Sequence, residues 1–353
     1  MKIIKNKLLF LLTGSIFTLL IYFPGLSGGI LLDDGPQLMP IMNDITAENW
    51  RSNFKQHLLS NSGHLSRPIA MATFILNAAL SGNNLWHWKL TNVIFHGLTG
   101  IAVFFCTRSL LSFKKDFSPE KQLYISLGVS LLWLVHPLHV STVLYLVQRM
   151  TILATLFIFL ALACFIQGIK KECRKENGSY FLLSAIFIFF PLSLLSKESG
   201  ALFPVYALLT NQYLRHDADY KEHVHARLKP YIVFLWALIS IGAIVFFYKF
   251  DVFVSQGYHF REFTLTERLL TEPRVIFLYL YQIITPLPSS MGFYHDDIQL
   301  STSFFNPVST AYSAIAVVLL ISILVFKFKK LGLISFGFLF FFCSHLIEST
   351  VLP

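Results

Sequence analysis

Long apolar runs decide which class of fold this chain can adopt. Stretches of roughly 17–25 residues with few charges recur along it, and a helix of that length crosses the hydrocarbon core of a bilayer. Of the 353 residues, 55% are hydrophobic and 13% are charged, whereas soluble domains carry about 25% charged residues. The runs are continuous and do not alternate with period two, so the spans are predicted to be α-helices and a transmembrane barrel is excluded.

Basic residues gather in five short islands between these runs. If every island faces the cytoplasm, the positive-inside rule is satisfied, and topology rather than nucleic-acid binding explains the net charge of +9. The four cysteines are scattered without CxxC spacing, which indicates neither a disulfide framework nor a zinc site. The islands lie within 2–7, 108–121, 170–175, 215–229 and 327–330.

The order of runs and islands predicts an all-α polytopic membrane protein with about nine transmembrane helices. We interpret the first run, which closes near Leu26, as an uncleaved span with its N-terminus in the cytoplasm. The C-terminus then lies on the outer face, and 1–353 is expected to form a single domain. The other eight spans are predicted at 88–111, 122–136, 150–169, 179–196, 201–214, 231–248, 307–326 and 331–346.

Two large outer loops, 27–87 and 249–305, each contain an apolar segment too short to cross the membrane. Pro68–Leu80 begins with a proline that suits the first position of a helix, and a Ser-Gly-Asn-Asn stretch ends it. Arg274–Ile284 is bounded by Pro273 and a later proline. Pro68–Leu80 is predicted to be a helix that lies along the membrane surface, and Arg274–Ile284 is predicted to be a half-buried or interfacial helix that does not cross the membrane.

An acidic pair, Asp33-Asp34, follows the first apolar run directly. Adjacent carboxylates repel each other, and neither is stable in lipid. On the outer surface, one of them can take the proton from an acceptor hydroxyl, or the pair can hold a divalent cation. The Asp-Gly-Pro sequence also favours a plain solvated turn, so the residues alone leave these interpretations open.

Two cations, Arg149 and Lys197, lie at the outer ends of predicted spans and are flanked by apolar sequence. A phosphate or pyrophosphate leaving group needs positive charge nearby as its bond breaks, and both side chains supply it. The same positions suit side chains that snorkel to the membrane surface. Glu198 beside Lys197 adds the alternative of a structural ion pair.

Most other ionisable residues outside the islands map to the same face. His136 and His139 flank a proline without an acidic neighbour, which favours a hydrogen-bonding or packing role over a metal site. His345 and Glu348 are one helical turn apart and are placed to face one cavity. The remaining candidates are Arg67 and Arg274, which border the surface helices and suit anionic lipid, and a second acidic cluster, His295, Asp296 and Asp297, whose alternative is a polar loop.

Four blocks of the sequence lie at 67–96, 133–157, 193–209 and 266–297. Together they resemble bacterial relatives of the TMTC-type O-mannosyltransferases, which are integral-membrane GT-C glycosyltransferases. The resemblance implies a GT-C-like helical bundle, a polyprenyl-phosphate-linked sugar donor, and a catalytic acidic pair in the first outer loop. Asp33-Asp34 matches that pair by position, with Asp33 favoured as the base. Such relatives often continue with more spans and tetratricopeptide repeats, so a chain that ends at Pro353 is interpreted as short or truncated.

The expected activity is transfer of a sugar from a polyprenyl phosphate to a protein hydroxyl or a glycan, at the outer face of a bacterial inner membrane. Membrane lipids, the donor and the acceptor are the expected partners, nucleic acid is not, and a divalent cation remains compatible with the site. The alternatives are a flippase or transporter for lipid-linked sugars, which needs charges through the membrane depth, and an inactive truncated scaffold. Asp33 and Asp34 are the expected catalytic residues; Arg67, Arg149, Lys197, Arg274 and His345 would bind lipid phosphate, and His136, Glu198, His295, Asp296, Asp297 and Glu348 would support them.

Overall fold

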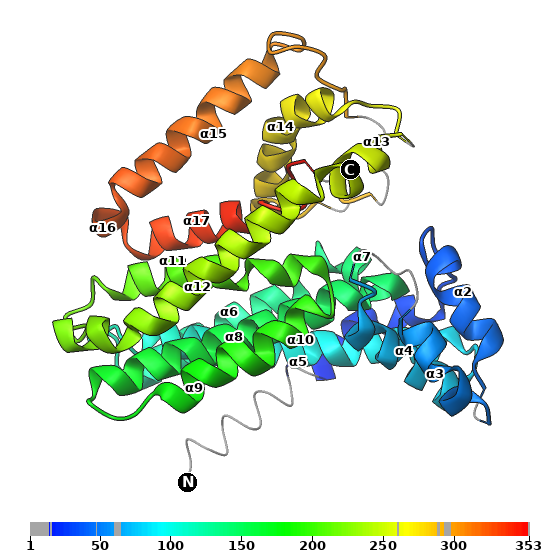
Figure 1. The fold of residues 1–353 in the computed structure, drawn as a ribbon, viewed down its shortest axis with the longest axis horizontal. Coiled ribbons are helices and arrows are strands. Elements are labelled where there is room, and N and C mark those ends of the chain that lie inside the picture. The colour runs from blue at the N-terminus through cyan, green and yellow to red at the C-terminus, as the bar shows by residue number, and fades with distance from the viewer. Residues whose placement is uncertain are drawn as a thin grey trace. The chain divides into compact units, whose positions relative to one another are not determined.

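A computed structural model describes residues 14, 16–46, 48–59, 65–259, 261–287, 290–292 and 298–351. Within these ranges every regular element is a helix, apart from one isolated bridge between Ser303 and Asn306. The all-α prediction is therefore confirmed for the described residues. The chain divides into two compact units, Met1–Phe203 and Pro204–Pro353; in Figure 1 the first runs from blue to green and the second from green to red.

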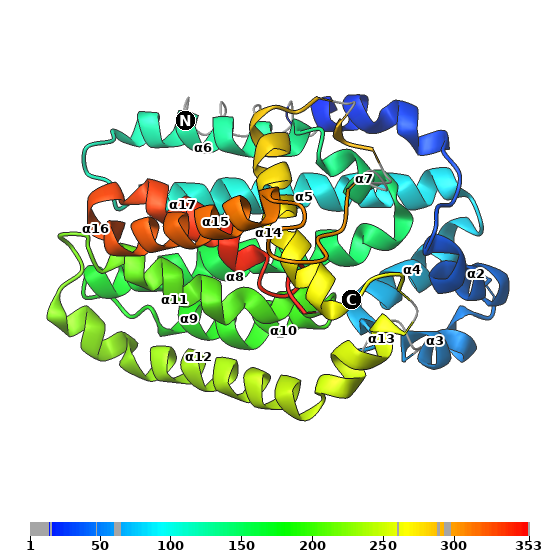
Figure 2. The ribbon, with the colours of Figure 1, turned by 90° about the horizontal axis from the view of Figure 1, so that it is seen from above.

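The first unit is built on two long helices, α5 (Leu85–Leu111) and α8 (Arg149–Cys173). Helix α5 packs against α8 on one side and against α6 (Pro119–Val135) on another, and Figure 2 shows the three lying side by side. Small residues allow close approach, because a Cβ at Gly100 would fall on the Leu134 side chain of α6. Shorter elements complete this unit: η1 (Phe23–Ser27), α7 (His139–Leu144), η2 (Leu146–Gln148), α9 (Ser179–Ser184), η3 (Ala185–Phe189), α10 (Phe190–Leu194) and η4 (Glu198–Leu202).

Three helices occupy the predicted first outer loop: α2 (Asp34–Asp44), α3 (Trp50–Leu58) and α4 (Pro68–Ser81). The prediction of a helix over Pro68–Leu80 is confirmed: the helix begins at its proline and ends where Gly82 takes a left-handed φ of 55°. Its position along the membrane surface stays a prediction. The expectation of a simple turn at Asp-Gly-Pro was incomplete, because these residues form the first turn of α2.

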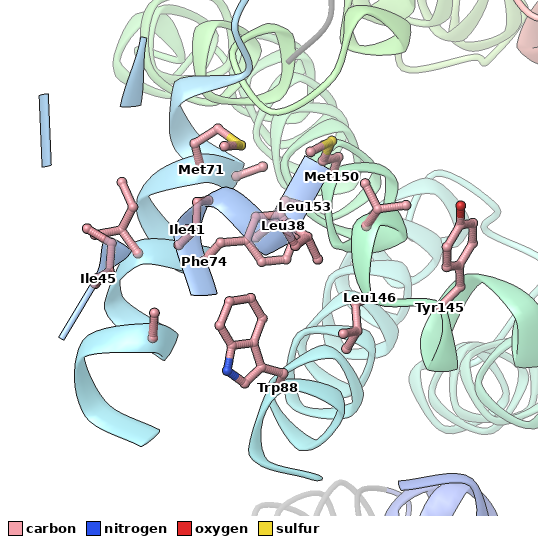
Figure 3. Packing of buried hydrophobic residues seen from close by; sticks show 14 of the residues in the cluster. Leu38, Ile41, Ile45, Met71, Phe74, Trp88, Tyr145, Leu146, Met150 and Leu153 are labelled. Carbon is pink, nitrogen blue, oxygen red and sulfur yellow. The ribbon is translucent and has the colours of Figure 1, made fainter. Parts of the chain in front are cut away.

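A continuous hydrophobic core fixes these loop helices. Leu38 and Ile41 of α2 are buried against Phe74 of α4, and the same cluster includes Trp88 of α5 and Leu146 of η2 (Figure 3). Each fully buried side chain of this size contributes roughly 1.5–3 kcal/mol. The loop is thus a packed layer of helices, which gives the acidic pair at its start a fixed position.

The second unit contains α11 (Phe203–Leu214), whose first residue belongs to the other unit, and α12 (Glu222–Tyr248), η5 (Asp251–Ser255) and α13 (Gln256–Tyr258). Then follow α14 (Leu265–Ile284), α15 (Ser309–Phe326), α16 (Phe328–Leu331) and α17 (Leu333–Ser344). The prediction that a surface helix starts at Arg274 was wrong. A capping box formed by Thr264 and Glu267 starts α14 nine residues earlier, at Leu265. Pro273 lies inside this helix.

Four described helical segments are long and apolar enough to cross a membrane: Leu85–Leu111, Leu146–Cys173, Glu222–Tyr248 and Ser309–Phe326. Shorter apolar helices occur at Ile16–Ser27, Pro68–Ser81, Ser179–Leu194 and Leu333–Ser344. These helices support a membrane protein. The count of nine spans stays a prediction, since α6 and α11, at two of the predicted positions, have 17 and 12 residues.

Candidate functional site

The two acidic residues at the start of α2 have different environments. Asp33 is exposed, whereas Asp34 is 1% exposed. The Oδ1 atom of Asp34 accepts a hydrogen bond from the backbone N–H of Val147 at 2.8 Å, and its Oδ2 accepts one from Leu31 at 3.0 Å. Asp34 thereby joins the start of the first outer loop to η2, the short helix that directly precedes α8. Asp33 is the carboxylate of the pair that faces solvent.

Opposing forces act on the charge of Asp34. Burial raises the pKa of this carboxyl above its ordinary value and is the largest effect. The hydrogen bonds from Leu31 and Val147 and the positive charge of Lys89 act in the opposite direction. The group is therefore sensitive to its neighbours, and each donor or cation that remains in place favours its ionised form.

Tyr145 places the backbone of the acidic pair. Its hydroxyl accepts a 2.7 Å hydrogen bond from the N–H of Asp33, and burial raises the pKa of Tyr145 to about 12, so the phenol stays neutral. The connection between α7 and η2, which contains Tyr145, is held in place by Asn92 of α5. The Asn92 amide donates to the carbonyl oxygens of Val143, Tyr145 and Leu146 at 3.1–3.3 Å.

Arg149 is fully buried and occupied within the protein. Its Nε donates to Asn92 Oδ1 at 2.7 Å, its Nη1 to the carbonyl of Thr73 at 3.1 Å, and its Nη2 to the carbonyl of Trp88 at 2.9 Å. The guanidinium carbon also lies 4.3 Å from the centre of the Phe74 ring. These bonds tie α4, α5 and α8 together, and each of the three guanidinium nitrogens has an acceptor within the protein.

Arg67 and Glu198 form an ion pair that the sequence did not suggest. The Arg67 Nε and Nη2 atoms each lie 2.9 Å from Glu198 Oε2, and Nη1 contacts the sulfur of Met150 at 3.2 Å. Burial acts to raise the pKa of Glu198, but the bonds and charge of Arg67 hold it below its usual range. Nearby on α10–η4, Lys197 Nζ donates to the hydroxyl of Thr151 at 3.1 Å.

His136 belongs to a cluster of aromatic rings, in which it contacts His139 edge-on. His139 lies 4.5 Å from the Trp133 ring and 5.3 Å from the His96 ring, centre to centre, and 6.4 Å from His136. Burial, with the neighbouring His96 and His136, lowers the pKa of His139 to about 3, so it stays uncharged. The packing interpretation of this pair fits the contacts. Across the described residues, no group of three His, Cys, Asp or Glu side chains is arranged to hold a metal ion.

Three predicted residues lie in the second unit. Arg274 on α14 donates from Nη1 to the carbonyl of Gln299 at 2.6 Å and to the hydroxyl of Ser301 at 3.2 Å. His345 stacks on Tyr279 with ring centres 5.6 Å apart. The carbonyl of Glu348 accepts a 2.6 Å bond from Arg268. The acidic cluster His295, Asp296 and Asp297 lies outside the described residues.

The sequence reasoning missed the residues that support the acidic pair, chiefly Lys89, Asn92 and Tyr145. Lys89 carried a readable signal, because an ionisable residue inside a candidate membrane span is usually functional. Asn92 and Tyr145 carried none, since their partners lie about 50 and 112 residues away along the chain.

Comparison with known proteins identifies relatives with one shared name. The chain is 27% identical to human protein O-mannosyl-transferase TMTC2 over 242 residues, which are 65% of this chain and 27% of that protein. It is 30% identical to the mouse TMTC2 protein over 242 residues, which again are 65% of this chain and 27% of that protein. It is 29% identical to mouse TMTC4 over 163 residues, which are 43% of this chain and 22% of that protein. The chain is a relative of the TMTC-type protein O-mannosyl-transferases.

This finding confirms the family resemblance read from the sequence. The matched region spans only about a quarter of the length of these relatives. No family model matches the chain, and no solved structure is significantly similar to it.

Proposed function

We propose that this protein is a membrane glycosyltransferase that moves a sugar from a polyprenyl phosphate to a hydroxyl of a protein or a glycan. Relatives named as protein O-mannosyl-transferases support the reaction class. In this chain, the proposal is supported by the acidic pair, in which an exposed Asp33 is next to a buried and hydrogen-bonded Asp34.

In the proposed reaction, Asp33 acts as the general base. Its carboxylate takes the proton of the acceptor hydroxyl while the acceptor oxygen forms a bond to the anomeric carbon of the sugar. The bond between that carbon and the phosphate oxygen breaks, and the polyprenyl phosphate leaves with the electron pair. Asp34 does not contact the reactants in this scheme, because both of its oxygens bind backbone N–H groups that orient the turn.

Cations near the leaving group would stabilise the phosphate as its charge develops. In the first unit, Arg67 and Lys197 suit this role because both side chains are partly exposed. Arg274 and His345 belong to the second unit, and their role as phosphate ligands stays a prediction from the sequence. For Arg149 we propose a structural role in place of phosphate binding, since burial and its hydrogen bonds to Asn92 and two carbonyls use its donors.

The proposed location is the outer face of a bacterial inner membrane, with a cytoplasmic N-terminus and a periplasmic C-terminus. The charge islands support this orientation. A divalent cation at the acidic pair stays compatible with the proposal, with Asp33 as its exposed carboxylate ligand.

A transfer assay tests the proposal. Purified protein is given a radiolabelled polyprenyl-phosphate sugar and candidate acceptors, beside the variants Asp33→Asn and Asp34→Asn. Loss of a general base lowers the rate by roughly 10²–10⁴-fold, so we expect that loss for Asp33→Asn. Asp116→Asn, which neutralises an exposed carboxylate between α5 and α6, is the matched control and should keep full activity.

Equal transfer by wild type and Asp33→Asn would refute the catalytic assignment. Donor translocation in sealed vesicles without transfer to any acceptor would favour the flippase alternative.

A further inference from the structure

Arg108 has a guanidinium nitrogen that is buried without a hydrogen-bond acceptor. This residue lies in the last turn of α5, and among the described residues none accepts a hydrogen bond from its Nη1 atom. A buried N–H group of a charged side chain is costly when it is unpaired, and in folded proteins such a group is typically satisfied by water or by a bound ion. Arg108 therefore points to an acceptor from outside the described chain.

Helices α5 and α8 end side by side at this point. They run in the same direction, since Asn92 meets Arg149 near their starts and Ser109 meets Gln167 near their ends. The Gln167 amide donates to the Ser109 hydroxyl at 2.7 Å, at the residue that follows Arg108 in the sequence. The last turn of α8 is therefore the neighbour of Arg108.

Two more cations lie in this turn of α8 or directly after it. Lys170 is in the last turn, and Arg174 follows the helix, with its backbone N–H bonded to the Lys170 carbonyl at 3.2 Å. Residues four apart on a helical turn share one face. Lys170 is partly exposed and Arg174 is exposed, and the charges that act on Lys170 are those of Arg174 and Arg108. These three residues form a cation cluster, whose like charges repel one another unless an anion lies among them.

The carboxylates on the last turn of α8 and directly after it have other partners. Glu172 is buried and accepts a hydrogen bond from the N–H of Gly178 at 2.7 Å, while a carboxylate oxygen of Glu176 lies 2.6 Å from the Nζ atom of Lys171. In the part of the chain that the structure describes, no carboxylate forms an ion pair with a member of the cation cluster. The cluster thus keeps its charge available for an anion from outside the protein.

The position of the cation cluster along the helices indicates which anion it meets. Lys170 lies roughly 30 Å along α8 from Arg149, which is about the thickness of the hydrocarbon core of a bilayer. The cluster is therefore expected at the depth of the lipid headgroups, on the face that the charge islands assign to the cytoplasm. Phe105, one turn before Arg108 on α5, is 49% exposed and lies on the side of the cluster toward the membrane interior.

We propose that the cation cluster binds the phosphate group of an anionic phospholipid from the cytoplasmic leaflet, with an acyl chain against Phe105. A phosphate offers several acceptor oxygens, so it can pair with Arg108 Nη1 and still lie between the other two cations. Basic residues at this surface attract anionic lipids. A lipid fits better than free phosphate because the exposed ring of Phe105 gives the acyl chain an apolar contact beside the charges. The site is separate from the acidic pair and does not depend on the proposed glycosyl transfer.

Native mass spectrometry of the purified protein in detergent measures the binding of each lipid directly. The probes are phosphatidylglycerol and phosphatidylcholine with the same acyl chains, and inorganic phosphate is added as a soluble competitor. One basic residue near an anionic headgroup contributes about 1 kcal/mol, which is about fivefold in affinity. We expect phosphatidylglycerol to bind at least about tenfold more tightly than phosphatidylcholine, and Arg108→Gln and Arg174→Gln each to weaken its binding about fivefold. Inorganic phosphate at the concentration of the lipid should not displace it.

Lys171→Gln is the matched control, because it removes a positive charge from the same turn of α8 but its ammonium is already paired with Glu176. This variant should bind phosphatidylglycerol within about twofold of wild type. Arg174 is exposed, so Arg174→Gln tests the cluster even if Arg108→Gln fails to fold. Equal loss of binding in Lys171→Gln and Arg174→Gln would attribute it to general surface charge and overturn the inference. Equal affinity for the two lipids, or displacement of phosphatidylglycerol by inorganic phosphate at the lipid concentration, would also overturn it.

Discussion

Replacing Arg149 by Met should destabilise the first unit, because the guanidinium holds three helices together. The variant leaves the buried Asn92 Oδ1 without its 2.7 Å donor, at a cost of about 1–3 kcal/mol. It also removes the desolvated cation–π contact with Phe74, which contributes about 2 kcal/mol. Removal of the buried charge recovers part of its desolvation energy. We expect a net loss of about 2–4 kcal/mol in the free energy of unfolding.

A thiol-reactive fluorophore provides the assay, since Cys106 on α5 is free and buried and becomes reactive when this unit unfolds. A unit of this size shifts its melting temperature by about 2–4 °C per kcal/mol, so Arg149→Met should melt at least about 4 °C below wild type. Lys197→Met removes a partly exposed cation, and it should melt within about 2 °C of wild type. Arg149→Lys keeps the charge without the planar fork and should fall between them.

The two roles considered for Arg149 give opposite results. If Arg149 has a structural role, Arg149→Met lowers the thermal stability whether or not a donor lipid is present. A phosphate ligand predicts unchanged stability in the free protein and weaker binding of the donor. A melting temperature of Arg149→Met equal to that of wild type, together with loss of donor binding, would refute the structural role.

Two further stability predictions concern the segment that carries Glu198. A Cβ at Gly200 would fall on the backbone of α10 at Ser193, so Gly200→Ala should cost about 1–3 kcal/mol in thermal unfolding, whereas Gly97→Ala, with no atom within 4 Å, should not destabilise. The folded-state pKa of Glu198 is lowered, so its pairing with Arg67 stabilises the protein above the ordinary carboxyl pKa and is lost as pH falls through the lowered value. Unfolding measured between pH 7 and about 3 should therefore show that Glu198→Gln loses less stability than wild type; parallel curves would contradict this.

Local signals made some elements predictable and others not. Helix α4 could be bounded from sequence because its proline and glycine act within one turn of its ends. Helix α2 could not, since Asp-Gly-Pro is compatible with a turn or a helix start, and burial of Leu38 and Ile41 decides between them. The start of α14 was missed because Pro273 was read as a boundary, whereas the capping box at Thr264 determines it.

The residues of the candidate site were likewise only partly predictable from the sequence. Adjacent carboxylates after an apolar run marked Asp33 and Asp34 from sequence alone, because charge is costly at that position. Their unequal burial could not be read, since it depends on Val147 more than 100 residues away. The hydrogen bonds of Arg149 could not be read from the sequence for the same reason, because its partners Thr73 and Asn92 belong to other helices.

The backbone at the acidic pair explains why its two members should respond differently to the same substitution. Leu32 has a φ of 27°, a conformation that costs a non-glycine residue about 1–3 kcal/mol and persists only when its surroundings enforce it. The hydrogen bonds that the side chain of Asp34 accepts from Leu31 and Val147 hold Leu32 in this conformation. An amide at position 34 sets an N–H donor against one of these N–H groups and releases the turn, whereas an amide at position 33 leaves every one of these bonds in place. Asp33→Asn should therefore lose chemistry with unchanged stability, and Asp34→Asn should lose stability together with activity.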